Sequence, residues 1–269
     1  MKTLSDAAIR AKLAPIRCFL LDMDGTFYLG DRLIPGSLEF LDALQKTGRT
    51  ARFLTNNSSK SASVYREKLL LMGVDARYTD VITSAHAAAQ YCLSHFPGQQ
   101  GFLLGNPALR AELEGMGLQF TDEGAQYVLV GFDTTLDYAK MTRVCDFIRA
   151  GLPYIATHPD FNCPTETGFI PDMGAIMAFI EASTGRKADV ILGKPHRGIV
   201  EEALRRTGYP LCEMAMVGDR LYTDVATGVR HGMTGILVLS GEATLEDVQA
   251  SEIQPDLIFD CLASMIPYL

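Results

Sequence analysis

Short apolar stretches alternate with stretches of helical spacing along most of this chain, and this alternation constrains its fold more than any other feature. Residues 18–21 form a continuous apolar run, as expected for a strand buried on both faces of a parallel sheet. Further strands are expected at 51–54, 190–192, 214–217 and 236–239, and helices at 35–46, 59–72, 196–207 and 222–231. Alternation of this kind predicts an α/β fold on a doubly wound parallel sheet, similar to a Rossmann fold.

The middle of the chain has its own alternation of elements. Strands are expected at 101–104, 127–130 and 154–157, followed by a long polar loop over 158–171. We therefore expect a smaller α/β domain inserted into the first. The predicted core comprises residues 1–83 and 188–269, and the predicted insertion comprises residues 84–187.

Composition excludes several classes of protein. The 269 residues are 48% hydrophobic and 21% charged, so a disordered or fibrous chain is not expected. A net charge of -8, with no block of basic residues, disfavours binding to nucleic acid polymers or to membrane surfaces. The six cysteines are scattered without a C-x-x-C pair, and no segment has the pattern of a signal peptide or a membrane span. We expect a soluble, cytoplasmic protein with reduced thiols.

The strongest local signal is the acidic turn Asp22-Met23-Asp24-Gly25-Thr26, directly after the first predicted strand. Ligands of open α/β sheets bind at the carboxyl ends of the strands. Paired carboxylates on such a turn suit a hard divalent cation such as Mg²⁺. The alternative is a purely structural turn with an aspartate capping a helix.

Three further polar motifs follow predicted strands. Thr55, Asn56 and Asn57 offer hydroxyl, amide and backbone N–H groups to a phosphate. Lys194 supplies a compact positive charge. Asp219 ends a strand in Gly218-Asp219, and Asp224 lies five residues later. Each motif alone is also explained by helix capping or by an ordinary surface residue.

Taken together and in this order, the four motifs resemble those of the haloacid dehalogenase (HAD) superfamily. Asp22-x-Asp24-Gly25-Thr26 is similar to its first motif, Thr55 to its second, Lys194 to its third and Gly218-Asp219-x4-Asp224 to its fourth. The position of the insertion, with Pro164-Thr165-Glu166-x-Gly168 and Gly193-Lys194-Pro195, resembles phosphatases with a large α/β cap. These are the NagD-like, pyridoxal-phosphate and phosphoglycolate phosphatases.

The resemblance implies a mechanism. Asp22 would attack phosphorus and form an aspartyl-phosphate, and Asp24 would act as general acid and then as general base. Mg²⁺ would be held by Asp22, Asp219 and the main-chain carbonyl of Asp24. Thr55, Asn56, Asn57 and Lys194 would bind the phosphate. Asp224 would support the site by orienting Lys194 or a metal-bound water.

Substrate selection is expected from the inserted domain, because the core motifs hold only phosphate and metal. Its polar loop offers His158, Asn162, Cys163 and Glu166 as contacts to the leaving group. This sequence has His158 where the family commonly has Asn, and Asp172 where it commonly has Gly, so no relative's substrate can be carried over. The alternative is a loop that only excludes water.

The predicted function is hydrolysis of a small phosphorylated metabolite, such as a sugar phosphate or a nucleoside monophosphate, with Mg²⁺. Two other functions stay open at this point. One is phosphoryl transfer by a phosphomutase, although such enzymes usually carry smaller caps. The other is a non-catalytic, Mg²⁺-binding regulatory protein of the same fold. Assembly as a homodimer is also left open.

Overall fold

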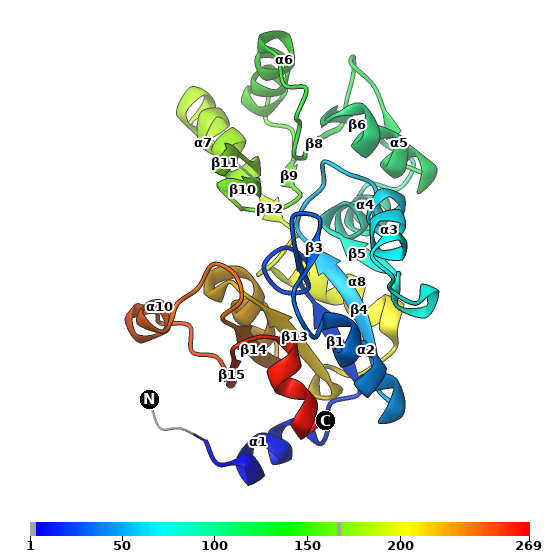
Figure 1. The fold of residues 1–269 in the computed structure, drawn as a ribbon. Helices are drawn as coiled ribbons and strands as arrows, with labels where there is room; N and C mark the ends of the chain where they lie inside the picture. The colour runs from blue at the N-terminus through cyan, green and yellow to red at the C-terminus, as the bar shows by residue number, and fades with distance from the viewer. Residues whose placement is uncertain (1–3, 166–167) are drawn as a thin grey trace. The chain divides into compact units, whose positions relative to one another are not determined.

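The structure, a computed structural model, describes residues 4–165 and 168–269. The chain divides into two compact units (Figure 1). The first comprises residues 1–55, 65–82 and 203–269, and the second comprises 56–64 and 83–202. The predicted division into core and cap places these boundaries differently, because here the segment after Thr55 and the segment around Lys194 belong to the second unit.

The first unit is built on a six-stranded sheet with the order β15-β14-β13-β1-β4-β5. Strands β1, β4, β13, β14 and β15 pair in parallel with their neighbours. This confirms the predicted doubly wound sheet, and the order matches the common one of dinucleotide-binding folds. The strands are β1 (Cys18–Leu21), β4 (Thr50–Thr55), β5 (Val81–Thr83), β13 (Met214–Gly218), β14 (Thr234–Val238) and β15 (Leu257–Phe259).

Helices and short turns surround this sheet and bury its apolar strands. Phe19 of β1 packs edge-to-face on Phe40, and Phe27 packs in the same way on Phe53 of β4. The helices and the small hairpin are α1 (Asp6–Leu13), β2 (Tyr28–Leu29), β3 (Arg32–Leu33), α2 (Ser37–Lys46), α9 (Ala226–Arg230) and α10 (Leu245–Ala250). Helices α3 (Ala62–Leu71) and α8 (Arg197–Thr207) each contribute residues to both units.

The second unit has a five-stranded parallel sheet with the order β12-β9-β8-β6-β7. Its own core gathers apolar side chains of β6, β8, β9, α6 and α7. The elements are α4 (Ser84–His95), β6 (Gln100–Leu104), α5 (Pro107–Gly115), β7 (Gln119–Phe120), β8 (Tyr127–Val130), α6 (Tyr138–Arg149), β9 (Tyr154–Ala156), β10 (Asn162–Thr165), β11 (Gly168–Pro171), α7 (Met173–Thr184) and β12 (Val190–Ile191).

Three sequence-based expectations need correction. The expected polar loop over 158–171 contains the antiparallel hairpin β10–β11, which tolerates Pro164 because a two-stranded hairpin has only edge strands. The strand expected at 190–192 exists as β12, but it pairs with β9 rather than with a strand of the six-stranded sheet. The helix expected at 222–231 begins as a π-helical turn over Leu221–Val225.

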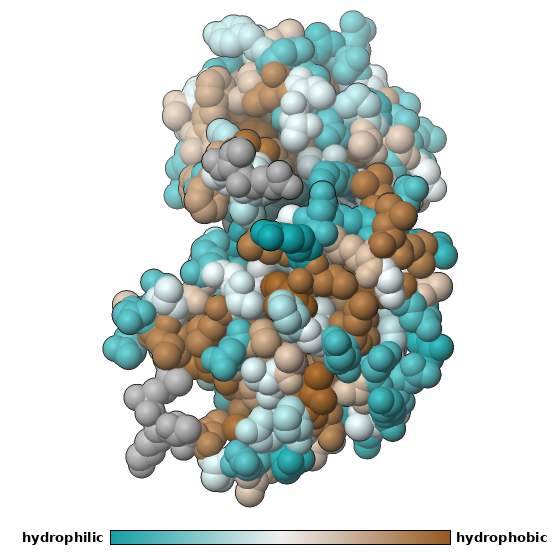
Figure 2. Space-filling view, in the orientation of Figure 1, coloured by the Kyte–Doolittle hydropathy of each residue, from teal (hydrophilic) through white to brown (hydrophobic). Residues whose placement is uncertain are grey.

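The surface mixes polar and apolar side chains (Figure 2). Exposed apolar residues occur in both units, for example Leu71 and Tyr138. Much of any folded protein's surface is apolar, so scattered residues of this kind indicate no particular interaction. Within the described part of the chain, no helix combines the length and the apolar character that crossing a bilayer requires.

Candidate active site

Asp22 and Asp219 meet because their strands are neighbours. β1 and β13 lie side by side in parallel, and Asp22 and Asp219 each follow the carboxyl end of one of them. The backbone N–H of Asp22 donates to the carbonyl of Val217 at 2.9 Å. From this pair the strand order runs outward in opposite directions, toward β5 on one side and toward β15 on the other. Ligand crevices of open α/β sheets form at such switch points.

Three carboxylates converge there. Asp22, Asp219 and Asp224 each offer an oxygen, and these atoms lie within 4.8 Å of one another. Asp22 is half-buried, whereas Asp219 and Asp224 are buried. The carboxylate of Asp24 is exposed and does not belong to this group. The side chain of Asp24 is therefore accessible to water.

The carboxylate of Asp219 is held on several sides. The hydroxyl of Thr26 donates to its Oδ1 at 3.4 Å, and the N–H of Glu242 donates to its Oδ2 at 2.8 Å. A Cβ at Gly25 or at Gly241 would overlap with this carboxylate. Gly25 also has a φ of +83°, which only glycine adopts readily. The glycine of the first motif is thus needed both for the turn and for the approach of Asp219.

The electrostatics of this cluster fit a bound cation. Burial, and then the neighbouring charges of Asp22 and Asp224, raise the pKa of Asp219 to about 7. The N–H of Glu242 and the guanidinium of Arg220 act in the opposite direction. Carboxylates gathered this closely repel one another unless a positive charge lies between them. An oxygen-only donor set suits Mg²⁺, so these residues fit the ion that the fourth motif implies.

Asp224 reaches the cluster through the π-helical turn. Its Oδ2 accepts the backbone N–H of Arg220 at 3.1 Å. A Cβ at Gly218 would overlap with the side chain of Asp224, so the strand must end in glycine for this turn to close.

The predicted phosphate-binding residues fall on both sides of the boundary between the units. Thr55 ends β4 in the first unit, and Asn56, Asn57 and Lys194 belong to the second. Asn56 holds the Lys194 peptide from both sides: its Oδ1 accepts the N–H at 2.6 Å, and its Nδ2 donates to the carbonyl at 2.9 Å. Nδ2 also donates to Oδ2 of Asp160 at 2.9 Å. The side chain of Asn56 is therefore occupied by protein groups.

Comparisons with known proteins agree with this geometry. Residues 19–119 match the model of the haloacid dehalogenase-like hydrolases, and residues 191–265 match a second HAD-hydrolase-like model. The acid sugar phosphatase of Staphylococcus aureus is 38% identical over 94% of this chain and 98% of its own length. The chain belongs to the haloacid dehalogenase-like hydrolases.

Solved structures show to which branch of the superfamily the chain is similar. A 4-nitrophenylphosphatase from Thermotoga maritima is 48% identical, with a TM-score of 0.92 over 95% of this chain and 98% of that one. NagD from Escherichia coli K-12 is 32% identical, with a TM-score of 0.84 over 92% and 97% of the two chains. This HAD hydrolase is accordingly a phosphatase of the NagD branch.

In this HAD phosphatase, the residues that the sequence predicts to contact substrate differ in their burial. Asn162 is exposed and Cys163 is half-buried on β10, with Sγ of Cys163 at 3.7 Å from Nδ2 of Asn57. His158 is fully buried. Glu166 lies outside the described residues.

Sequence reasoning did not select Asp160, although it stands inside the polar stretch that contains His158 and Asn162. Asp160 is buried and bonded to Asn56, a contact that joins segments about a hundred residues apart. Its neighbours His158 and Pro159 carry no pattern that would have separated it from an ordinary turn residue. Asp172 stands where the family commonly has Gly, and its carboxylate is hydrogen-bonded to His158, the other residue that departs from the family.

Proposed function

We propose that this phosphatase hydrolyses monoesters of small phosphorylated metabolites, sugar phosphates foremost, and that it requires Mg²⁺. The observation that carries the proposal is the carboxylate cluster of Asp22, Asp219 and Asp224 at the switch point of the sheet. The similarity to an enzyme named acid sugar phosphatase, across almost the whole chain, supports the substrate class. Nucleoside monophosphates are the class of substrate with which sugar phosphates are to be compared.

Asp22 acts as the nucleophile in this proposal. It is half-buried at the end of β1, and its backbone N–H is bonded to the carbonyl of Val217, which fixes the position of its main chain beside β13. Attack on phosphorus breaks the bond to the leaving oxygen and forms an aspartyl-phosphate on Asp22. A metal ion held by Asp22, Asp219 and the main-chain carbonyl of Asp24, with Asp224 supporting, would offset the negative charge of the phosphate.

Asp24 transfers the protons. Its exposed carboxyl gives a proton to the leaving alkoxide and then takes one from the water that cleaves the aspartyl-phosphate. By the family resemblance, Lys194 and Thr55 bind the phosphate oxygens. The side chain of Asn57 is bonded to protein groups instead, with Oδ1 accepting from the N–H and the hydroxyl of Ser59 and Nδ2 donating to Sγ of Cys163. The side chain of Asn56 holds the Lys194 peptide instead, since both of its polar atoms already bond to protein groups.

The test is phosphate release from a panel of sugar phosphates and nucleoside monophosphates, with p-nitrophenyl phosphate as a generic ester. We expect the highest kcat/KM for a sugar phosphate. The variant Asp22→Asn keeps the shape of the side chain and should lose nearly all activity on every ester. Retention of more than about a tenth of kcat, which corresponds to ~1.4 kcal/mol of barrier, would remove Asp22 from the role of nucleophile.

A further inference from the structure

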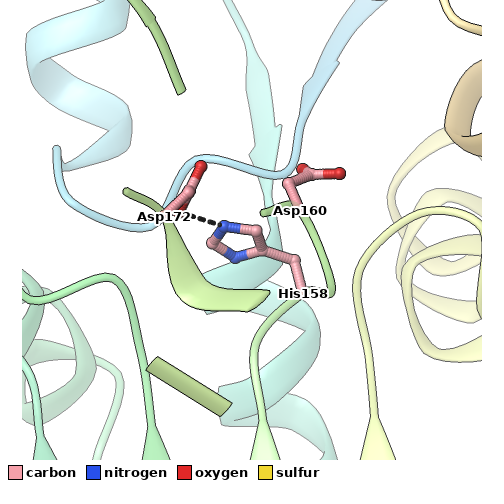
Figure 3. Close-up of side chains that lie close together, drawn as sticks. All are labelled: His158, Asp160 and Asp172. Carbon is pink, nitrogen blue, oxygen red and sulfur yellow. Dashed lines mark hydrogen bonds and ion pairs between the residues drawn. The ribbon is translucent and has the colours of Figure 1, made fainter. Parts of the chain in front are cut away.

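The second unit contains a buried group of potential metal ligands far from the motifs in sequence. His158, Asp160 and Asp172 are 0%, 7% and 4% exposed. Each offers one ligand atom, and these atoms lie within 4.8 Å of one another. Figure 3 shows the imidazole of His158 between the two carboxylates, with Nε2 bonded to Oδ1 of Asp172 at 2.9 Å.

Backbone contacts hold the three residues in place. Asp172 caps the N-terminus of α7, and its N–H donates to the carbonyl of Phe161 at 2.9 Å. The N–H of Gly174 donates to the carbonyl of Asp160 at 2.7 Å. A Cβ at Gly174 would lie 2.9 Å from that same carbonyl oxygen, so the approach of α7 requires glycine. The cluster is thus formed by the fold itself.

One carboxylate oxygen in this cluster has no partner among the described residues. Oδ2 of Asp160 accepts from Asn56, but Oδ1 is buried without a hydrogen bond. An unsatisfied buried carboxylate oxygen is costly, because it has lost water and gained no donor. Within the same cluster, a cation bound between the two carboxylates would satisfy it.

The surrounding hydrogen bonds are those that a metal-bound histidine needs. With Nε2 on a metal, Nδ1 of His158 carries the proton and donates to Oγ1 of Thr157, 3.0 Å away. Oγ1 of Thr157 in turn lies 3.2 Å from Oγ of Ser58, and this Oγ accepts a hydrogen bond from the N–H of Phe132. Oδ1 of Asp172 also accepts the N–H of Met173. These hydrogen bonds come from residues outside the cluster and orient the side chains of His158 and Asp172.

We propose that His158, Asp160 and Asp172 form a second metal site, for a divalent first-row transition ion such as Zn²⁺ or Mn²⁺. The imidazole nitrogen distinguishes it from the oxygen-only cluster of Asp22, Asp219 and Asp224 and selects against Mg²⁺. On binding, the metal takes the place of the proton between His158 and Asp172. Because β10 and β11 lie between Asp160 and Asp172 in the chain, the ion ties together the base of that hairpin.

The experiment measures metal binding at the second site in a protein whose catalytic cluster has been disabled by substitution. Full-length Asp22→Asn/Asp219→Asn protein is stripped with EDTA and dialysed against Zn²⁺ alone or Mg²⁺ alone. We expect one bound equivalent of Zn²⁺ and a higher Tm with Zn²⁺ but not with Mg²⁺. Adding Asp160→Asn or His158→Gln should weaken Zn²⁺ binding by at least about 100-fold, more than the loss of an outer contact causes.

Matched controls come from the same unit. Asp189→Asn removes a partly exposed carboxylate, and His95→Gln removes an exposed imidazole. Both should keep the bound equivalent. No bound Zn²⁺ in the catalytic-site background, or an equivalent that survives Asp160→Asn and His158→Gln, overturns the proposal.

A spectroscopic measurement covers the case in which a variant fails to fold. Pulsed electron paramagnetic resonance of Mn²⁺ bound to the Asp22→Asn/Asp219→Asn protein should show coupling to an imidazole nitrogen. The His95→Gln protein in the same background should show the same coupling. A spectrum of bound Mn²⁺ without nitrogen coupling overturns the proposal, because the catalytic cluster offers only oxygen.

Discussion

At the scale of single residues, Asp219 shows how a buried cluster of carboxylates opposes the stability of the fold. Burial and the charges of Asp22 and Asp224 raise its pKa from an ordinary value of 3.8 to about 7. A group whose pKa is higher in the folded state stabilises the fold fully below its unfolded pKa, and this contribution is lost as pH rises through about 7. Without metal, the ionised cluster should therefore destabilise the protein at pH 8.

The variant Asp219→Asn tests whether the ionised cluster destabilises the protein at pH 8. In EDTA at pH 8 the variant should unfold at a higher temperature than the wild type, with a gain on the order of a few kcal/mol at about 1.4 kcal/mol per pKa unit. At pH 5 the gain should be smaller, because only part of the contribution has been lost between the unfolded pKa of 3.8 and that pH. Scanning calorimetry at both pH values measures it, with the exposed Asp42→Asn as control. A variant less stable than wild type at pH 8 would contradict the argument.

Asp24 is predicted to act after as well as before the aspartyl-phosphate forms. Nitrophenolate leaves without a proton, so Asp24→Asn should still be phosphorylated by p-nitrophenyl phosphate, but water attack loses its base. We expect a rapid burst of about one equivalent of nitrophenol followed by turnover at least about 100-fold slower than wild type. Stopped-flow absorbance measures both phases. Linear release at the wild-type rate would show that Asp24 is not the general base for the attacking water.

At the scale of elements, Asn56 joins three segments: the loop after β4, the turn after β9 and the turn after β12. Its side chain fixes the Lys194 peptide and the Asp160 carboxylate through bonds of 2.6–2.9 Å. Asn56→Ala removes all three bonds and leaves buried groups unsatisfied, so it should cost about 1–3 kcal/mol of stability and lower kcat/KM on every ester.

Asn56→Asp is the sharper companion variant. It keeps an acceptor for the N–H of Lys194 but turns an oxygen toward the Asp160 carboxylate and the Lys194 carbonyl. We expect it to have a lower Tm than Asn56→Ala, although it is closer in shape to the native residue. Thermal unfolding of the pair measures the difference. If Asn56→Asp proved as stable as wild type, the donor role of Nδ2 would be wrong.

At the scale of the whole molecule, catalysis and substrate choice are assigned to different parts of the chain. The hairpin β10–β11 carries Asn162 and Cys163, which the sequence predicts to contact the leaving group. Asn162→Ala and Cys163→Ala should change kcat/KM unequally across sugar phosphates and nucleoside monophosphates, and should spare p-nitrophenyl phosphate. Kinetics on the substrate panel test this. Uniform effects on all esters would favour a hairpin that only excludes water.

The carboxylate cluster of Asp22, Asp219 and Asp224 predicts that hydrolysis depends on a divalent ion. EDTA should abolish hydrolysis and Mg²⁺ should restore it, because the cluster offers only oxygen ligands. Ca²⁺ should inhibit, since its larger and looser coordination misplaces the nucleophile. Phosphate release with each ion alone measures the effect. Full activity in a preparation free of divalent ions would contradict the assignment of these carboxylates.

The amino-acid sequence alone predicts the fold class and the family, because strand and helix periodicities and the turn motifs at strand ends are local properties. For the same reason it singles out Asp22, Asp24 and Asp219 as candidate site residues. That β12 joins the sheet of β9, that Asn56 is occupied by the Lys194 peptide and that His158 meets Asp160 and Asp172 emerge only from the folded chain. Those contacts join segments distant in the chain, and no local pattern encodes which buried polar group will satisfy another.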